Sequence, residues 1–196
     1  MIVRQREVSV IMRIIAFAIA MLMMNVATAA DEAQATVAER QAQFANQLFI
    51  DACLAHLGDR KAIVRWARKQ GLGRTAPDFA RATLQDEPGE VWSAANDVGE
   101  FVVLVKANGN CEVWARRADA KAATRIFEAG LQGATRPGQT VARVDQREIQ
   151  AQGITYSQVG WHLKLDGQKY GWVLIAITTD SADAEVQVRL SADRTR

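Results

Sequence analysis

The chain has 196 residues, of which 49% are hydrophobic and 23% are charged, and its formal net charge is +2. This near balance of charge gives no electrostatic case for binding nucleic acid or an anionic membrane surface. The length suits one domain, and it is sufficient to bury a hydrophobic core without a framework of disulfides.

The first 29 residues have the three-part pattern of a cleavable secretory signal peptide. Three arginines precede or open an unbroken apolar run at residues 14–24, and Ala27-Thr28-Ala29 then places small residues where a signal peptidase cleaves. The apolar run is too short to span a bilayer, which needs about 20 residues. We therefore expect residues 1–29 to be removed. A retained membrane anchor is the alternative interpretation.

Export changes how the charge is interpreted. Residues 1–29 carry three of the 24 basic and one of the 22 acidic residues, which leaves 21 of each in residues 30–196.

Translation could also begin at Met12 instead of Met1, because Met12-Arg13 makes a compact start for a signal peptide. We expect a periplasmic or secreted protein with no stable membrane span and no nucleic-acid partner.

Cys53 and Cys111 are the two cysteines of the chain. In an oxidising compartment such a pair is most simply a disulfide. It would close a loop of about 58 residues, worth roughly 4 kcal/mol in the chain-entropy model. The alternatives are two free buried thiols, or a nucleophilic cysteine assisted by His56 or His162, although no catalytic signature surrounds either cysteine.

Apolar residues at three- and four-residue spacing predict helices in the first half of the chain. One helix is expected over about residues 35–56, with Cys53 on its buried side and with residues 30–43 frayed. A second helix should start at Asp59 as its N-cap, and its many basic side chains should form a solvated face or, as the alternative, contact the acidic surface of a partner. Gly71 should end this second helix.

A third, short helix and a polar loop follow. Pro77 suits the first turn of the helix, and Phe79 and Leu84 would be its buried contacts. Asp86-Glu87 and Glu90 then flank a Pro-Gly turn. These acidic residues could form paired carboxylates, but a solvated loop is the simpler interpretation.

Beyond this turn the apolar pattern changes to a period of two, which is typical of strands. Strands are expected at residues 91–94, 101–106 and 110–117. Asn108-Gly109 is a strong signal for a tight hairpin. In the last of these strands Cys111 falls on the expected core face, together with Val113 and Ala115, and Trp114 falls on the opposite face.

The second half of the chain begins with a helix from Asp119, and four more strands are expected at residues 140–150, 154–165, 170–178 and 185–190. The first is mostly polar and suits a sheet edge. A shift of the apolar phase within the second predicts a β-bulge at Gly160. Residues 170–178 are apolar on both faces, so this strand should be central and covered.

These elements predict an α+β fold. N-terminal helices are followed by an antiparallel sheet with one inserted helix, in the order βββ-α-βββ or with one further strand, and the helices pack on one face. We expect one domain over residues 30–196, with residues 191–196 frayed.

The sequence carries few signs of catalytic chemistry. The chain has no zinc-binding motif, nucleophile elbow, phosphate-binding loop or dinucleotide fingerprint, so we expect no metal and no cofactor. Ser157 with His162 and an aspartate could form a triad, but surface roles are the simpler interpretation for both. These features favour a protein that is not an enzyme.

Five tryptophans in a small domain suggest a surface for recognition. Trp114 and Trp161 are the candidate anchors of an interface with another protein, because Trp114 faces away from the core side of its strand and Trp161 follows the expected bulge. Packing in the core is the alternative for both residues.

Four segments of the chain suggest a family. Residues 48–54, 66–72, 88–92 and 109–119 contain the two cysteines and their aromatic neighbours. Over about residues 45–180 the chain resembles a family of uncharacterised proteobacterial envelope proteins. The resemblance implies a two-cysteine α+β domain in a secreted or periplasmic setting, and it implies no catalytic residue.

Two functions follow as hypotheses. The first is a non-catalytic binding, inhibitor-like or envelope-accessory protein with a protein partner in the periplasm or cell envelope. The second is a small envelope hydrolase acting on cell-wall or lipid material, which needs a pocket that holds His162 or paired carboxylates. A purely structural role is a third possibility.

Overall fold

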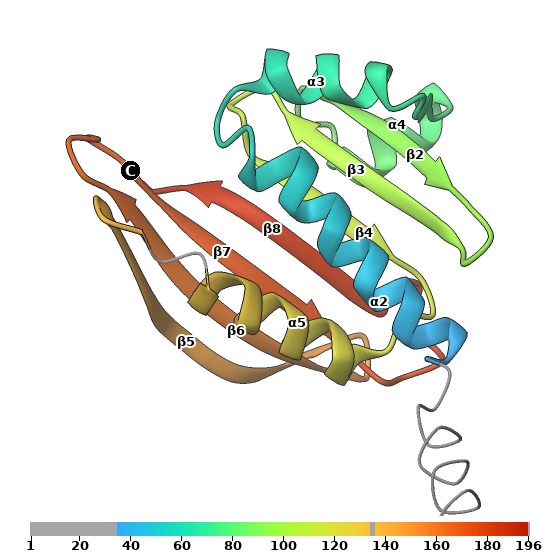
Figure 1. Cartoon of the computed structure of the whole chain (residues 1–196). Coiled ribbons are helices and arrows are strands. Elements are labelled where there is room, and N and C mark those ends of the chain that lie inside the picture. Colours follow the sequence, from blue (N-terminus) through green and yellow to red (C-terminus); the bar gives the residue numbers. More distant parts are fainter. Residues whose placement is uncertain (1–34, 134–135, 196) are drawn as a thin grey trace, which may run out of the picture. The chain divides into compact units, whose positions relative to one another are not determined.

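The structure is a computed structural model that describes residues 35–133 and 136–195, and the predicted signal peptide lies outside these residues (Figure 1). The helices are α2 (Val37–Leu48), the π-helix η1 (Phe49–Leu54), α3 (Arg60–Lys69), α4 (Pro77–Leu84) and α5 (Ala120–Gly133). The strands are β1 (Gly73–Arg74), β2 (Gly89–Ala95), β3 (Glu100–Lys106), β4 (Cys111–Ala115), β5 (Gln139–Ala151), β6 (Ile154–Leu165), β7 (Gly171–Thr178) and β8 (Val188–Arg194).

The strands form one antiparallel sheet in the order β1-β2-β3-β4-β8-β7-β6-β5, which confirms the α+β class. The last strand is central, since β8 pairs with both β4 and β7. The expectation of frayed residues 191–196 is therefore wrong over 191–194, where Ala192 lies between Cys111 and Leu174. The polar strand β5 occupies an edge, as its sequence predicts.

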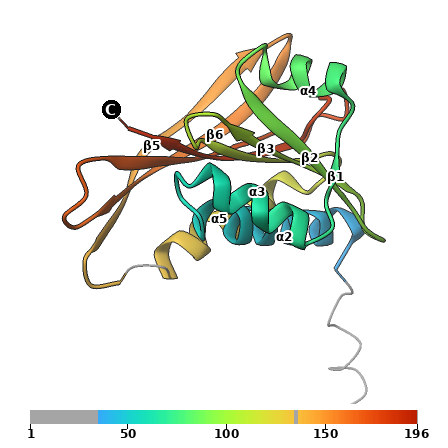
Figure 2. The ribbon, with the colours of Figure 1, turned by 90° about the horizontal axis from the view of Figure 1, so that it is seen from above.

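Helices lie on both faces of the sheet, which corrects the prediction of one covered face (Figure 2). On the first face α2 packs on β4 and β8, α3 on β3 and α5 on β7. The main hydrophobic core lies there. On the second face α4 packs on β2, because Leu84 contacts Val91 and Leu104, whose side chains alternate with those of the core. Phe79, expected to be buried, is 42% exposed.

The first helix is ordered from its N-terminus, so the expectation that residues 30–43 are frayed is wrong from Thr36 onward. Thr36 and Glu39 form a capping box, which satisfies amide groups of the first turn. Two buried polar side chains then fix the helix, because Gln41 donates to the Val98 carbonyl at 2.6 Å and Asn46 donates to the Ala123 carbonyl at 3.2 Å.

The Cys53–Cys111 disulfide is formed, as predicted, and it joins η1 to β4 with a Cα–Cα distance of 5.5 Å. Both cysteines are buried in the main core. The loops beside them approach closely, because a Cβ at Gly109 would lie 2.5 Å from the Gly58 carbonyl oxygen. Both glycines have positive φ, so these positions need glycine for conformation as well as for space.

The bulge lies on β5 and not at Gly160. The register shifts between Arg143 and Asp145, opposite Trp161 and Gly160, so that Val144 is the extra residue. Val144 is 57% exposed. A bulge and several charged side chains on a long edge strand discourage pairing with another chain.

Candidate functional site

The described residues cover the second face of the sheet only in part, and we call the centre that they leave uncovered the open sheet face. It is composed of outward residues on β3, β4, β8 and β7, namely Val102, Trp114, Arg189, Ser191, Val173, Ile175 and Ile177. All seven side chains are half-buried. α4 reaches the side of this face at Val102 and Trp114.

Strand β7 contributes an aliphatic row to the open sheet face. The sequence predicts a central strand that is covered on both sides, and β7 is indeed central. Its inward residues Trp172, Leu174 and Ala176 are buried in the main core. Its outward residues Val173, Ile175 and Ile177 belong to neither hydrophobic cluster and are only half-buried. One of the two expected covers is therefore absent from the part of the chain that the structure describes.

Trp114 and Arg189 form the polar end of the open sheet face. They lie opposite each other on β4 and β8, and the Arg189 guanidinium stacks 4.4 Å from the centre of the indole ring. The indole nitrogen donates to Glu112 at 3.0 Å. No carboxylate among the described residues pairs with Arg189, so its positive charge can serve a partner. Trp114 thus occupies the face that its sequence position predicts.

Trp161, the second predicted anchor, is a core residue. Its side chain is 7% exposed and belongs to the main cluster, between Val159 and Leu163 on the inward side of β6. Arg143 stacks 5.4 Å from its ring and covers it at the sheet edge. The expectation of an exposed anchor fails because no bulge interrupts β6 at Gly160, so the inward alternation continues through Trp161.

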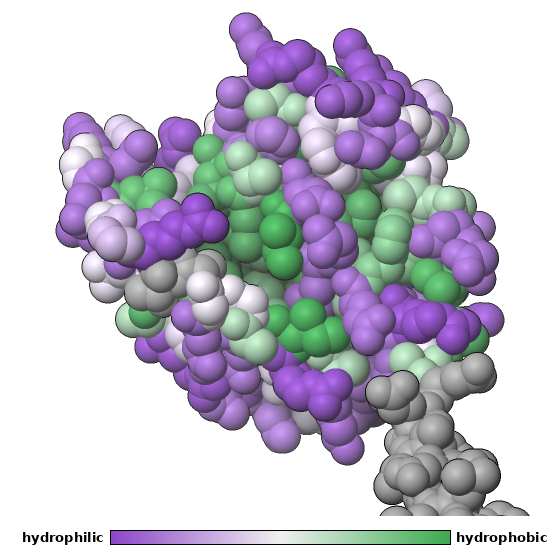
Figure 3. Space-filling view, viewed as in Figure 1, coloured by the Kyte–Doolittle hydropathy of each residue, from purple (hydrophilic) through white to green (hydrophobic). Residues whose placement is uncertain are grey.

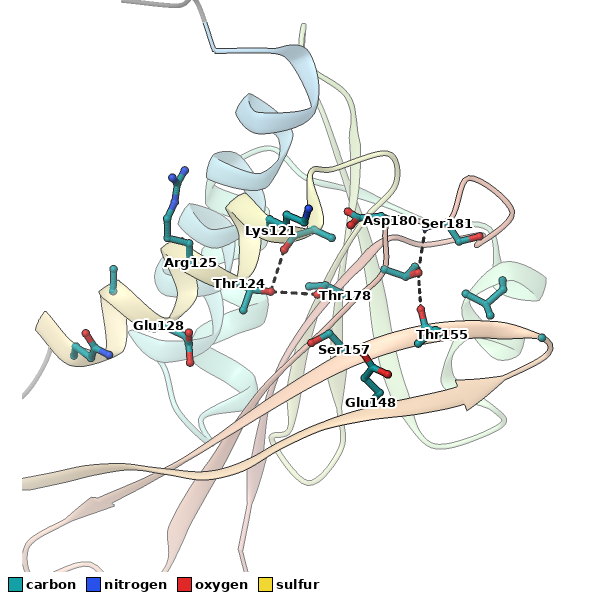
Figure 4. Close-up of a pocket in the computed structure, with 16 residues that line it drawn as sticks. Lys121, Thr124, Arg125, Glu128, Glu148, Thr155, Ser157, Thr178, Asp180 and Ser181 are labelled. Atoms are coloured by element: carbon teal, nitrogen blue, oxygen red, sulfur yellow. Dashed lines mark hydrogen bonds between the residues drawn. The ribbon is translucent and has the colours of Figure 1, made fainter.

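A polar cavity of about 910 Å³ lies between α5, the end of β7 and the β5–β6 hairpin (Figure 4). Its hydroxyl groups mostly bond within the protein. The Thr124 and Thr178 hydroxyls lie 3.2 Å apart, and Thr179 donates to the Thr155 carbonyl at 2.8 Å. Lys121 and Arg125 lie along the exposed side of α5. The cavity is open and of mixed charge.

The residues that a hydrolase would need do not converge in this cavity. Ser157 lines it, but His162 lies five positions along β6 on the opposite face of the sheet, so the two cannot form a dyad. Glu128 is paired with Arg143. Glu148 and Asp180 come from opposite sides of the lining, and their carboxylates do not face each other in Figure 4.

A second cavity, of about 620 Å³, lies on the helix-covered face between η1 and α5. Apolar residues from η1, α5 and strands β5 to β7 line most of it. Figure 3 shows hydrophobic surface in the gap between these two helices. This site was not predicted from the sequence, because its apolar lining residues have the ordinary spacing of core positions.

Charged groups at the α4 end of the sheet form local ion pairs. Glu90, expected in a solvated loop, is only 10% exposed and lies 2.5 Å from Arg60 and 2.9 Å from Arg74. Lys106 lies 3.2 Å from Glu87 and 3.7 Å from Glu112. Burial lowers the pKa of Lys106, but the carboxylates of Glu112, Glu87 and Asp193 outweigh it, so the pKa is raised above the ordinary 10.5.

Within 35–133 and 136–195, no three His, Cys, Asp or Glu side chains are grouped so that they could hold a metal ion. None of the helices in these two ranges has the length and hydropathy to cross a bilayer. No protein-family model and no curated protein matches the sequence of this chain.

Proposed function

We propose that this chain is an exported, non-catalytic binding protein that docks a protein partner in the periplasm or cell envelope on its open sheet face. The observation that carries the proposal is the outward aliphatic row Val173, Ile175 and Ile177 on β7. An antiparallel sheet with one solvated face normally presents polar side chains there. Three aliphatic side chains in the sheet centre favour a covered surface.

The charge of the open sheet face indicates the chemistry of the partner. Arg189 has no carboxylate partner among the described residues, and Trp114 holds its guanidinium in place. Tryptophan and arginine are the residue types that contribute most often to binding hot spots. The partner should therefore present an apolar surface with an acidic side chain directed at Arg189.

The disulfide and the signal-like N-terminus support the expected compartment. A buried disulfide is stable where the surroundings are oxidising, as they are in the periplasm and outside the cell. The alternative of an envelope hydrolase has less support, because Ser157 and His162 lie on opposite faces of β6.

Co-purification from an envelope extract tests this proposal. Tagged protein should retain a stoichiometric partner, and Ile175→Asp and Arg189→Glu should each weaken its binding by about 30-fold, the effect of losing roughly 2 kcal/mol. Val37→Asp and Lys61→Glu are the matched controls, because both residues are exposed and lie on helices α2 and α3 of the opposite, helix-covered face. Equal loss in the controls, or full retention in Ile175→Asp, would refute the proposal.

The oligomeric state of the purified protein provides a second test of the proposal. If wild type alone forms a dimer that Ile175→Asp dissociates, the cover of the open sheet face is a second copy of the chain and the proposed partner is wrong. A wild type that stays monomeric while it retains a partner supports the proposal.

A further inference from the structure

The apolar cavity between η1 and α5 has the size and the walls of a small-molecule site. Its volume of about 620 Å³ falls within the range of about 300–1,000 Å³ typical of ligand pockets. Phe49, Leu131 and Leu174 form its buried floor. Leu54, Ile126 and Val141 are half-buried at its sides. The site is distinct from the open sheet face, which lies across the sheet.

One charged residue lies in this lining. Of the sixteen lining residues, all within the described part of the chain, Arg136 alone carries a charge, and it is exposed at the rim. No carboxylate lines the cavity to oppose it. An apolar hollow with a single cation at its rim is complementary to an apolar chain that ends in one anionic group.

The walls are a poor match for an extended peptide. A buried peptide brings amide and carbonyl groups that each need a hydrogen-bond partner. Among the polar lining residues, Asn46 already donates to the carbonyls of Ala42 and Ala123. Gln139 is the other uncharged polar side chain of the lining. Such walls suit a ligand whose buried part is hydrocarbon.

We propose that this cavity binds a long-chain fatty acid, with its hydrocarbon chain between η1 and α5 and its carboxylate on Arg136. The π-helix contributes to the shape of the site, since Phe49, Ile50 and Leu54 of η1 all line the cavity. The fatty acid binds without a covalent step.

Gly130 offers a way to fill the cavity without disturbing the fold. It lines the cavity from α5, and a Cβ added there would meet no atom within 4 Å. Gly133 on the same helix also has open space around its position but does not line the cavity. Gly130→Phe therefore blocks the site, and Gly133→Phe is its matched control.

Fluorescence titration with cis-parinaric acid is the first test. The wild type should bind this fatty acid saturably, one molecule per chain, with a Kd on the order of micromolar. Gly130→Phe should abolish binding while its melting temperature is no lower than that of wild type, and Gly133→Phe should bind as wild type does. The absence of saturable binding to wild type, or unchanged binding to Gly130→Phe, would overturn the proposal.

The head group is tested separately. The methyl ester of cis-parinaric acid has the same hydrocarbon chain without the charge, so it should bind roughly fivefold more weakly than the acid. Arg136→Gln should remove that difference by weakening the acid alone. Equal affinity of acid and ester for wild type would refute the role of Arg136. Ile175→Asp should leave the titration unchanged, which separates this site from the open sheet face.

Discussion

The two faces of strand β7 differ in what covers them. Trp172, Leu174 and Ala176 lie beneath the helices in the main core, whereas none of the helices that the structure describes lies over Val173, Ile175 and Ile177 on the open sheet face. The residue types on the two faces are almost equally apolar. An apolar sequence on both sides of a strand therefore indicates only that both sides favour burial. The topology of the chain determines which of the two sides its own helices cover.

The largest expected effect concerns the disulfide that joins the helix layer to the sheet on the covered face. Replacing Cys53 and Cys111 together by Ala should lower the free energy of unfolding by about 4 kcal/mol, because the reduced chain regains the entropy of a loop of 58 residues. Urea denaturation of the exported protein, followed by tryptophan fluorescence, measures this loss. A loss below about 1 kcal/mol would show that the helix layer packs on the sheet without the disulfide.

Two neighbouring residues on β7 test the comparison itself. Leu174→Ala should cost about 3 kcal/mol, because Leu174 is fully buried and its removal leaves a cavity in the core. Ile175→Ala should cost about 1 kcal/mol in the isolated protein, since its side chain is only half-buried. Equal costs in urea denaturation would mean that the open sheet face is packed as tightly as the core.

Local patterns in the sequence predicted most of the fold. Asp59 caps α3 as expected, with its carboxylate accepting from the Ala62 amide at 2.9 Å. The Asn108-Gly109 turn and the inward phase of Cys111 are also confirmed. Caps, tight turns and alternation depend on a few adjacent residues, so they can be identified without knowledge of the tertiary fold.

Features that depend on distant partners could not be predicted in this way. The bulge at Val144 belongs to β5, but its signal in the sequence was the altered phase of its partner strand β6. The position of α4 on the second face depends on the contact between Leu84 and Leu104. These residues are far apart in the sequence, so a local pattern cannot predict their contact. Alternation along the strand predicted which side of the sheet Trp114 lies on. Whether a helix covers that side depends on distant elements and could not be predicted.

The smallest expected effect is a dependence on alkaline pH at the border of the open sheet face. The folded-state pKa of Lys106 lies above its unfolded value of 10.5, so folding favours the charged lysine. Its contribution is fully present below pH 10.5 and is lost as the pH rises through the folded-state pKa. Lys106→Met should therefore reduce this alkaline loss by less than about 1 kcal/mol, measured by urea denaturation across that pH range. A variant with the same alkaline profile as wild type would contradict this assignment.

Site-specific photo-crosslinking in the cell tests the docking surface most directly. A photoreactive phenylalanine at Ser191 lies in the centre of the open sheet face, and one at Arg65 lies on the exposed side of α3 on the helix-covered face. We expect one discrete adduct with another envelope protein from position 191, absent from position 65 and abolished by Arg189→Glu. Adducts of equal yield from both positions, or none from position 191, would contradict it.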